Sequence, residues 1–82
     1  MSNKTFKPSG PQLRVLHTLA AMSTRAKAQM IDVVLDRMDI SGQERGPMYR
    51  TVHALARAGV VKLNQAQTHI TLLAAGRAIV ER

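Results

Sequence analysis

The chain of 82 residues contains no cysteine. Without thiols, a disulfide framework and a thiolate-bound zinc site are both excluded. No stretch approaches the roughly 20 apolar residues of a membrane-spanning helix. The opening residues, MSNKTFKPSGP, are polar and basic and lack the apolar segment of a secretory signal. From these absences we expect a soluble cytoplasmic protein.

Acidic residues are few and unevenly placed. Five Asp or Glu stand against 12 Lys or Arg, so the formal net charge is +7. Four of the acids lie between Asp32 and Glu44, whereas residues 1–31 and 45–80 contain none. An excess of positive charge on so small a body favours polyanionic partners, because neutralising phosphates releases condensed counterions. We therefore expect a basic side and an acidic side; an Arg-rich surface that only aids solubility is the alternative.

The length of the chain bounds its organisation. It suits one small domain, which buries only roughly 60% of its unfolded surface and therefore gains stability from a partner subunit. Residues 1–8, with Lys4 and Lys7, are expected to be a flexible basic arm, and residues 9–82 the folded domain. Oligomerisation is expected on this ground.

The first helix is predicted over about residues 9–22. Ser9 and Gln12 fit a capping box and place Pro11 in the first turn. Apolar residues fall on two nearly opposite faces of this helix, so it is either sandwiched within the domain or shared with a second subunit. We favour the shared arrangement. The candidate dimer contacts are Val15, Leu19 and Met22, with Ile79 near the end of the chain.

The next two helices are predicted from capping signals. Thr24 can cap a second helix over about residues 25–38, whose aspartates lie mostly off its apolar stripe. A Ser-x-x-Glu capping box then begins at Ser41 and is followed at once by Gly-Pro, which a helix interior resists. We expect a short helical turn after Ser41, and then the main helix with Pro47 at its first position and Gly59 as its C-terminal stop.

The remainder of the chain reads as a hairpin and a last helix. Residues 60–63 and 68–72 are β-branched, partly alternating runs separated by the polar residues 64–67. Residues 73–80 suit a short helix. The predicted fold is mainly α with a small β-hairpin, in the order helix, helix, helix, hairpin, helix.

The third predicted helix separates apolar from basic residues. At 100° per residue, Met48, Val52 and Leu55 share one side. Arg50 and Arg57 lie near the opposite pole. The side that faces the core and the basic side are therefore distinct, although an ordinary solvated face would show the same separation.

A helix of this kind, preceded by another helix across a turn, has the form of a helix-turn-helix, whose second helix enters the major groove of DNA. Arg50 can then offer a pair of donors to guanine. Tyr49 and His53 can reach a base edge or a phosphate, and Arg45 and Arg57 can clamp the strand on either side. Tyr49 packing only against the second helix is the alternative for that residue.

Residues 49–61, YRTVHALARAGVV, followed by LLAAGRAI at residues 72–79, resemble the winged helix-turn-helix family of small prokaryotic transcription regulators. The resemblance covers roughly residues 11–80 in element order. It implies a recognition helix in the groove and a hairpin wing beside it. By that likeness Tyr49, Arg50, Thr51 and His53 sit at the groove, and Lys62, Asn64, Gln65 and Gln67 form the wing.

Two features depart from the family's pattern. Leu73 stands where these proteins usually have a capping threonine, so we expect Thr71 to serve as the cap or the helix to start later. The connection between the second and third helices, with its two glycines, is longer than a compact helix-turn-helix turn.

Catalysis and metal binding have little support. The three histidines lie on separate elements without ligand spacing, so we expect no metal site. No nucleophile, base and acid occur at a recognisable spacing, and there is no Gly-rich phosphate loop. We expect no enzyme, no cofactor, and no small-molecule effector.

The sequence thus predicts a protein that binds double-stranded DNA sequence-specifically as a homodimeric transcriptional repressor on a pseudo-palindromic site. Helix 47–58 would enter the major groove, and the wing at residues 64–67 would touch backbone or minor groove. Two alternatives stay open. One is a DNA-segregation or architectural protein of a plasmid or phage. The other is a protein-binding winged helix that acts as an inhibitor through exposed Val15 and Leu19.

Overall fold

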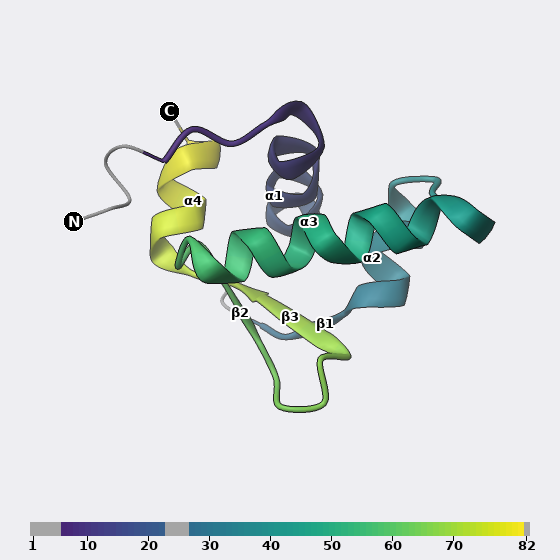
Figure 1. The fold of residues 1–82 in the computed structure, drawn as a ribbon. Helices are drawn as coiled ribbons and strands as arrows, with labels where there is room; N and C mark the ends of the chain where they lie inside the picture. Colours follow the sequence, from purple (N-terminus) through teal and green to yellow (C-terminus); the bar gives the residue numbers. More distant parts are fainter. Residues whose placement is uncertain (1–5, 23–26, 82) are drawn as a thin grey trace.

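The computed structural model describes residues 6–22 and 27–81. The elements run α1 (Gly10–Met22), β1 (Gln29–Met30), α2 (Ile31–Arg37), a 3-10 turn (Gly42–Glu44), α3 (Arg45–Arg57), β2 (Val61–Leu63), β3 (His69–Leu72) and α4 (Ala74–Val80) (Figure 1). The predicted mainly helical chain with a small antiparallel hairpin is confirmed. Within the described ranges, no helix is long and apolar enough to cross a membrane.

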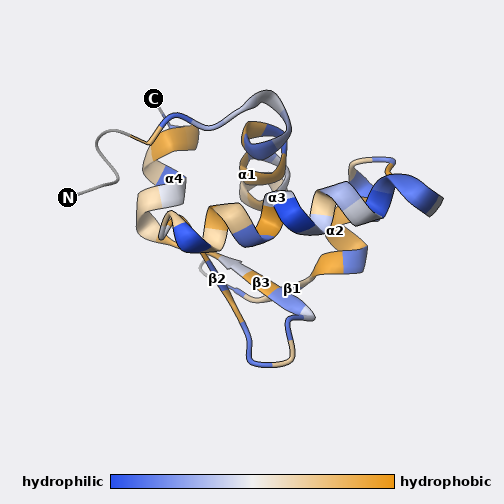
Figure 2. Ribbon diagram, in the orientation of Figure 1, coloured by the Kyte–Doolittle hydropathy of each residue, from blue (hydrophilic) through white to orange (hydrophobic). Residues whose placement is uncertain are grey.

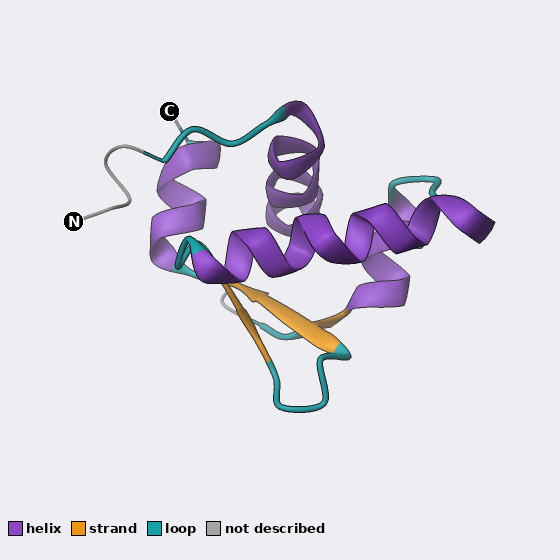
Figure 3. Ribbon diagram, in the orientation of Figure 1, coloured by secondary structure: helices purple, strands orange, loops and turns teal. Residues whose placement is uncertain are grey.

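The sheet contains one strand more than predicted. Its order is β1-β3-β2, with both pairs antiparallel, so β3 is central. The hairpin of β2 and β3 is confirmed, and Figure 3 shows its loop projecting away from the helices. In β1, Gln29 pairs with Ile70 and Met30 pairs with His69.

The predicted second helix is wrong in its first part, because the backbone there pairs with β3. The N–H of Ile31 donates to the carbonyl oxygen of Thr68 at 2.9 Å, and only then does α2 begin. The proposed cap at Thr24 lies outside the described residues. At Gln29 and Met30, pairing with a strand some forty positions later in the chain thus replaces the helix that the local pattern favoured.

The capping box at the start of α1 is confirmed. The N–H of Ser9 donates to Oε1 of Gln12 at 2.9 Å, and the N–H of Gln12 donates to Oγ of Ser9 at 3.4 Å. The second predicted box is wrong, because the Ser41 side chain makes no capping hydrogen bond. The short helical turn after Ser41 does form, but α3 follows it directly from Arg45.

Pro47 is therefore the third residue of α3 rather than the first. This position is still within the first turn, where backbone N–H groups have no intrahelical acceptor, so the missing proton costs no bond. The predicted stop at Gly59 is confirmed. Its φ is 79°, its N–H donates to Ala56 at 3.1 Å, and the N–H of Val60 donates to Leu55 at 3.3 Å, which is a Schellman ending.

The last helix starts one residue later than predicted. Leu73 occupies the capping position without a side-chain capping bond, and Thr71 belongs to β3 instead of serving as the cap. The N–H of Leu73 donates to the carbonyl oxygen of Val60 at 3.1 Å, which ties the start of α4 to the start of the hairpin.

The core gathers around α1, which contacts α2, α3, α4 and β3. Val15 and Leu19 are 0% and 2% exposed, and Leu16, about 60° from Leu19 around the helix, is also fully buried. Val15 and Leu19 are therefore wrong as candidate dimer contacts, because elements of the same chain cover them, and a subunit contact through other residues of α1 stays a prediction. Ile79 is also buried and Met22 is partly buried against the core, so neither forms an open seam.

Candidate nucleic-acid interface

α3 is held firmly by one side. Met48, Val52 and Leu55 are 8%, 2% and 0% exposed and belong to the core. Their spacing of four and three residues puts them on one stripe of the helix. Together with the Schellman ending, this packing fixes the direction in which the opposite side points. Figure 2 shows hydrophilic residues recurring along α3 and along the loop that follows β2.

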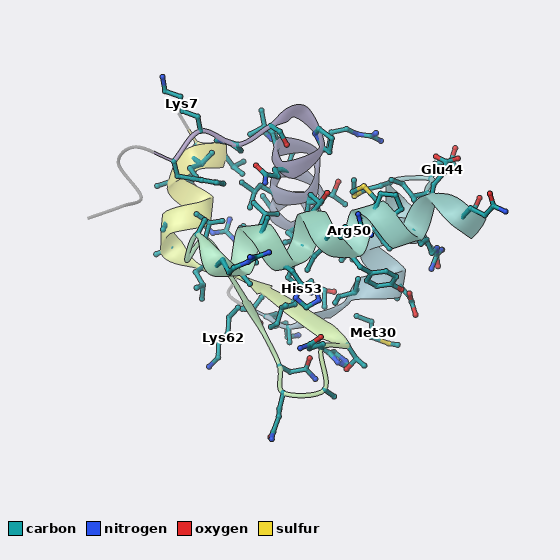
Figure 4. The ribbon with its side chains drawn as sticks, in the orientation of Figure 1. Lys7, Met30, Glu44, Arg50, His53 and Lys62 are labelled. Atoms are coloured by element: carbon teal, nitrogen blue, oxygen red, sulfur yellow. The ribbon has the colours of Figure 1, made fainter. Side chains whose placement is uncertain are left out.

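The opposite side of α3 carries Arg50, His53 and Arg57. Both arginines are exposed and His53 is partly exposed. No group among the described residues forms an ion pair or hydrogen bond with the guanidinium of Arg50 or Arg57. In Figure 4, His53 lies beside Arg50 on the side of α3 nearer the hairpin, and Lys62 projects beside that hairpin. These side chains are free to meet an external anion.

The N-terminal half of α3 is tied to α2 by Arg45 and Tyr49. Arg45 donates from Nη1 to Oδ1 of Asp32 at 3.2 Å, from Nη2 to Asp36, and from Nε to the carbonyl oxygen of Ile40 at 3.1 Å. The Tyr49 hydroxyl donates to the same Asp32 oxygen at 2.7 Å. We call Arg45, Tyr49, Asp32 and Asp36 the α2–α3 latch.

The latch changes the titration of both donors. The hydrogen bond to Asp36 raises the pKa of Arg45 further above its ordinary value. The hydrogen bond to Asp32 raises the pKa of Tyr49, and partial desolvation acts in the same direction. Both donors are thus committed to α2. This placement gives no support to Arg45 as a clamp on a DNA strand, and for Tyr49 it matches the alternative of a contact with the second helix.

The hairpin loop is organised by Asn64. Its Oδ1 accepts the N–H groups of Thr68 and His69, each at 2.8 Å, and its Nδ2 donates to Oγ1 of Thr68 at 3.0 Å. The N–H of Gln67 donates to the Asn64 carbonyl oxygen at 2.9 Å, which closes a turn. The Asn64 side chain therefore shapes the loop, and the exposed Gln65 and Gln67 are left to face outward.

The remaining predicted positions also divide into exposed side chains and side chains that already have a partner within the protein. Lys62 is exposed on β2, next to the loop. The hydroxyl of Thr51 donates to the carbonyl oxygen of Pro47 at 3.3 Å, so it already has an acceptor within α3. The structure thus brings Arg50, His53, Arg57 and Lys62 to the solvent side of α3 and the hairpin, and it turns Arg45 and Tyr49 toward α2.

Charge is graded along α3. Glu44 directly precedes the helix, and Asp32 and Asp36 flank its first turns through the latch. Beyond the latch, from Arg50 through the hairpin, the chain carries no acid. The basic surface therefore belongs to the C-terminal half of α3 and the hairpin. The expected acidic face is exposed at Asp32 and Asp36, and nothing in the local sequence pattern indicates that Arg45 forms ion pairs with them.

Comparisons with models of protein families, with curated proteins and with solved structures found no match to this chain. Within the part of the chain that the structure describes, no group of three or more metal-ligating side chains could hold a metal ion.

Proposed function

We propose that this protein binds duplex DNA sequence-specifically, with α3 in the major groove, and acts as a small transcriptional repressor. The observation that carries the proposal is the pair Arg50 and Arg57. Both are exposed, have no partner among the described residues, and lie on the solvent side of a helix whose other side packs in the core. The described residues form four α-helices and a small three-stranded antiparallel sheet with a projecting hairpin, which is compatible with a winged-helix arrangement.

The dimensions of α3 suit this role. A helix with its side chains is about 10–12 Å wide, and the major groove of B-DNA is about 12 Å wide. The 13 residues of α3 span about 20 Å, enough to place two turns of side chains against base edges. Lys62 and the hairpin loop would then meet the phosphates at the rim of the groove.

The latch gives the proposed complex a direction. Asp32 and Asp36 keep most of their side chains exposed, at 60% and 67%, and one arginine cannot balance two carboxylates. Phosphates are repelled from this end of α3 and attracted to the end that carries Arg57. The duplex would therefore lie over the C-terminal half of α3 and the hairpin.

A single helix of this size reads only a few base pairs, which is too little to specify a site in a genome. We therefore propose that two copies bind a pseudo-palindromic site, with half-site centres about 10 base pairs or a multiple of that apart. A dimer bound across a promoter would repress by occlusion. Because Val15 and Leu19 are buried, the subunit contact must use other residues.

The burial of Val15 and Leu19 also bears on one of the alternative functions. The alternative of an inhibitor that grips a protein through Val15 and Leu19 needs both side chains exposed. They are not, so this form of the alternative loses its basis. No specific feature of the described residues favours a segregation or architectural role over repression.

The experiment that tests the proposal is a selection of genomic fragments by the purified protein at two salt concentrations, followed by affinity measurements on the selected site. Arg50→Ala should weaken specific binding by about 1–3 kcal/mol and relax one base preference. Arg37→Ala is the matched control, because Arg37 is an exposed arginine at the end of α2, beside the acidic residues.

Two results would contradict the proposal. One is a selection that recovers no enriched duplex sequence, which would remove specific DNA binding altogether. The other is an equal loss of affinity in Arg37→Ala and Arg50→Ala, because net charge and not the surface of α3 would then govern binding.

A further inference from the structure

Arg50, His53 and Arg57 form a single line along α3. At 100° per residue they fall within about 60° of one another around the helix. Arg50 and Arg57 are separated by about 10.5 Å along its axis. Their spacing of three and then four residues is close to that of the three helix positions with which a zinc-finger helix reads successive bases. Such a line meets a run of three or four base pairs.

The chemistry of the line favours purines. An arginine places two donors on O6 and N7 of guanine, the commonest specific contact in the major groove. A neutral imidazole has one N–H donor, and N7 is the acceptor that both purines present in that groove. The guanidinium groups of Arg50 and Arg57 have no competing protein acceptor among the described residues, so both forks remain available.

The line of Arg50, His53 and Arg57 occupies a different part of the surface from the basic side chains that suit phosphate contacts. It lies opposite the buried stripe of Met48, Val52 and Leu55, so it is the part of α3 that enters deepest when the helix docks. Lys62 stands on β2, beside the helix and not on it. Arg45, at the start of α3, is occupied by Asp32 and Asp36. Base reading therefore falls to the two C-terminal turns of α3.

We infer that each half-site contains two guanines on one strand, separated by one or two base pairs, with a purine between them. Arg50 reads one guanine, Arg57 reads the other, and His53 contacts N7 of the intervening purine. This inference rests on the proposed function, and it names the sequence class that the same surface selects.

Arg50→Lys and Arg57→Lys test the inference, because lysine keeps the charge but lacks the planar fork that matches guanine. The wild-type protein should select sites with the stated guanine pair. Replacing either guanine with 7-deazaguanine, which lacks the N7 acceptor, should weaken wild-type binding about fivefold or more. Each lysine variant should become less sensitive to that replacement at one guanine only, because its ammonium can still donate to N7 but without the planar two-bond geometry, and it should keep its dependence on salt.

Arg37→Lys is the matched control and should behave as the wild type. If the selected sites lack the guanine pair, or if both lysine variants keep the full wild-type preference, the arginines contact phosphates and the inference is overturned while duplex binding stands. If the wild-type protein selects no duplex at all, the proposed function itself fails. The two failures are therefore distinguishable.

Discussion

Gly76 provides the sharpest test of how α4 is placed. It is buried, and a Cβ atom built on it would overlap the carbonyl oxygen of Val60, while lying 2.7 Å from Cδ1 of Leu72 and 3.3 Å from the carbonyl carbon of Val60. The Leu72 side chain can rotate away, but the Val60 carbonyl cannot, because it accepts the N–H of Leu73 at 3.1 Å, just before α4 begins. A methyl group at this position must push α4 off the hairpin.

The magnitude follows from two opposing terms. In an open helix, Gly→Ala gains up to about 1 kcal/mol from helix propensity. Forcing an extra carbon into a packed contact costs about 1–3 kcal/mol, and the rigid carbonyl puts Gly76→Ala at the upper end. We therefore expect the free energy of unfolding to fall by about 2 kcal/mol, the difference between the two terms. In a domain of this size, each kcal/mol lowers Tm by about 4–8 °C.

Urea denaturation followed by far-ultraviolet circular dichroism measures this change. Gly46→Ala is the matched control, because a Cβ on Gly46, in the first turn of α3, meets nothing within 4 Å. That variant should be as stable as the wild type or more stable by up to about 1 kcal/mol. If Gly76→Ala is equally tolerated, α4 does not pack on Val60 in the way described, and the reasoning is refuted.

Three further predictions concern the core, the loop and the latch. Leu35→Ala, at a fully buried position, should lower the free energy of unfolding by about 2–5 kcal/mol in the same assay, and a loss below 1 kcal/mol would contradict its place in the core. Gln67 has a φ of 60°, so Gln67→Gly should raise stability by about 1 kcal/mol, and a lower stability would show that the loop closes differently. Tyr49 is the only tyrosine, so absorbance at alkaline pH reports its ionisation, and its pKa should lie above 10.0. In Asp32→Asn the pKa of Tyr49 should move back toward 10.0, because the hydrogen bond to the carboxylate is lost. A pKa that this variant leaves unchanged would argue against the latch. The pKa of Tyr49 is raised in the folded protein, so the stabilisation by the Tyr49–Asp32 hydrogen bond is complete below the pKa that this tyrosine has in the unfolded chain. The stabilisation is lost as pH rises through the pKa in the folded protein.

Three signals that are satisfied within a few residues led to correct predictions, whereas the capping box predicted at Ser41 was wrong. The reciprocal bonds of Ser9 and Gln12, the left-handed Gly59 after α3 and the turn from Asn64 to Gln67 all close over short stretches of chain. Where a local helical pattern competed with pairing to a strand distant in the chain, the predicted helix was wrong. Gln29 and Met30 fit the predicted helix but pair with β3.

The candidate interface also combines features set by short-range pattern with features set by long-range contacts. The periodicity of α3 alone separated Met48, Val52 and Leu55 from Arg50 and Arg57, because residues on one helix have a fixed angular relation wherever the helix lies. The arginines of the proposed base-reading line were therefore predictable, although their contact with DNA stays a prediction.

The sequence by itself determined the mainly helical chain, the hairpin and the two sides of α3, since each depends on neighbours within about one or two turns. Only the tertiary structure decided that Arg45 and Tyr49 turn to Asp32 and that Val15 and Leu19 of α1 are buried within the same chain. The physical reason is that these contacts join elements far apart in the chain. Their partners are set by how the helices pack, which no local pattern specifies.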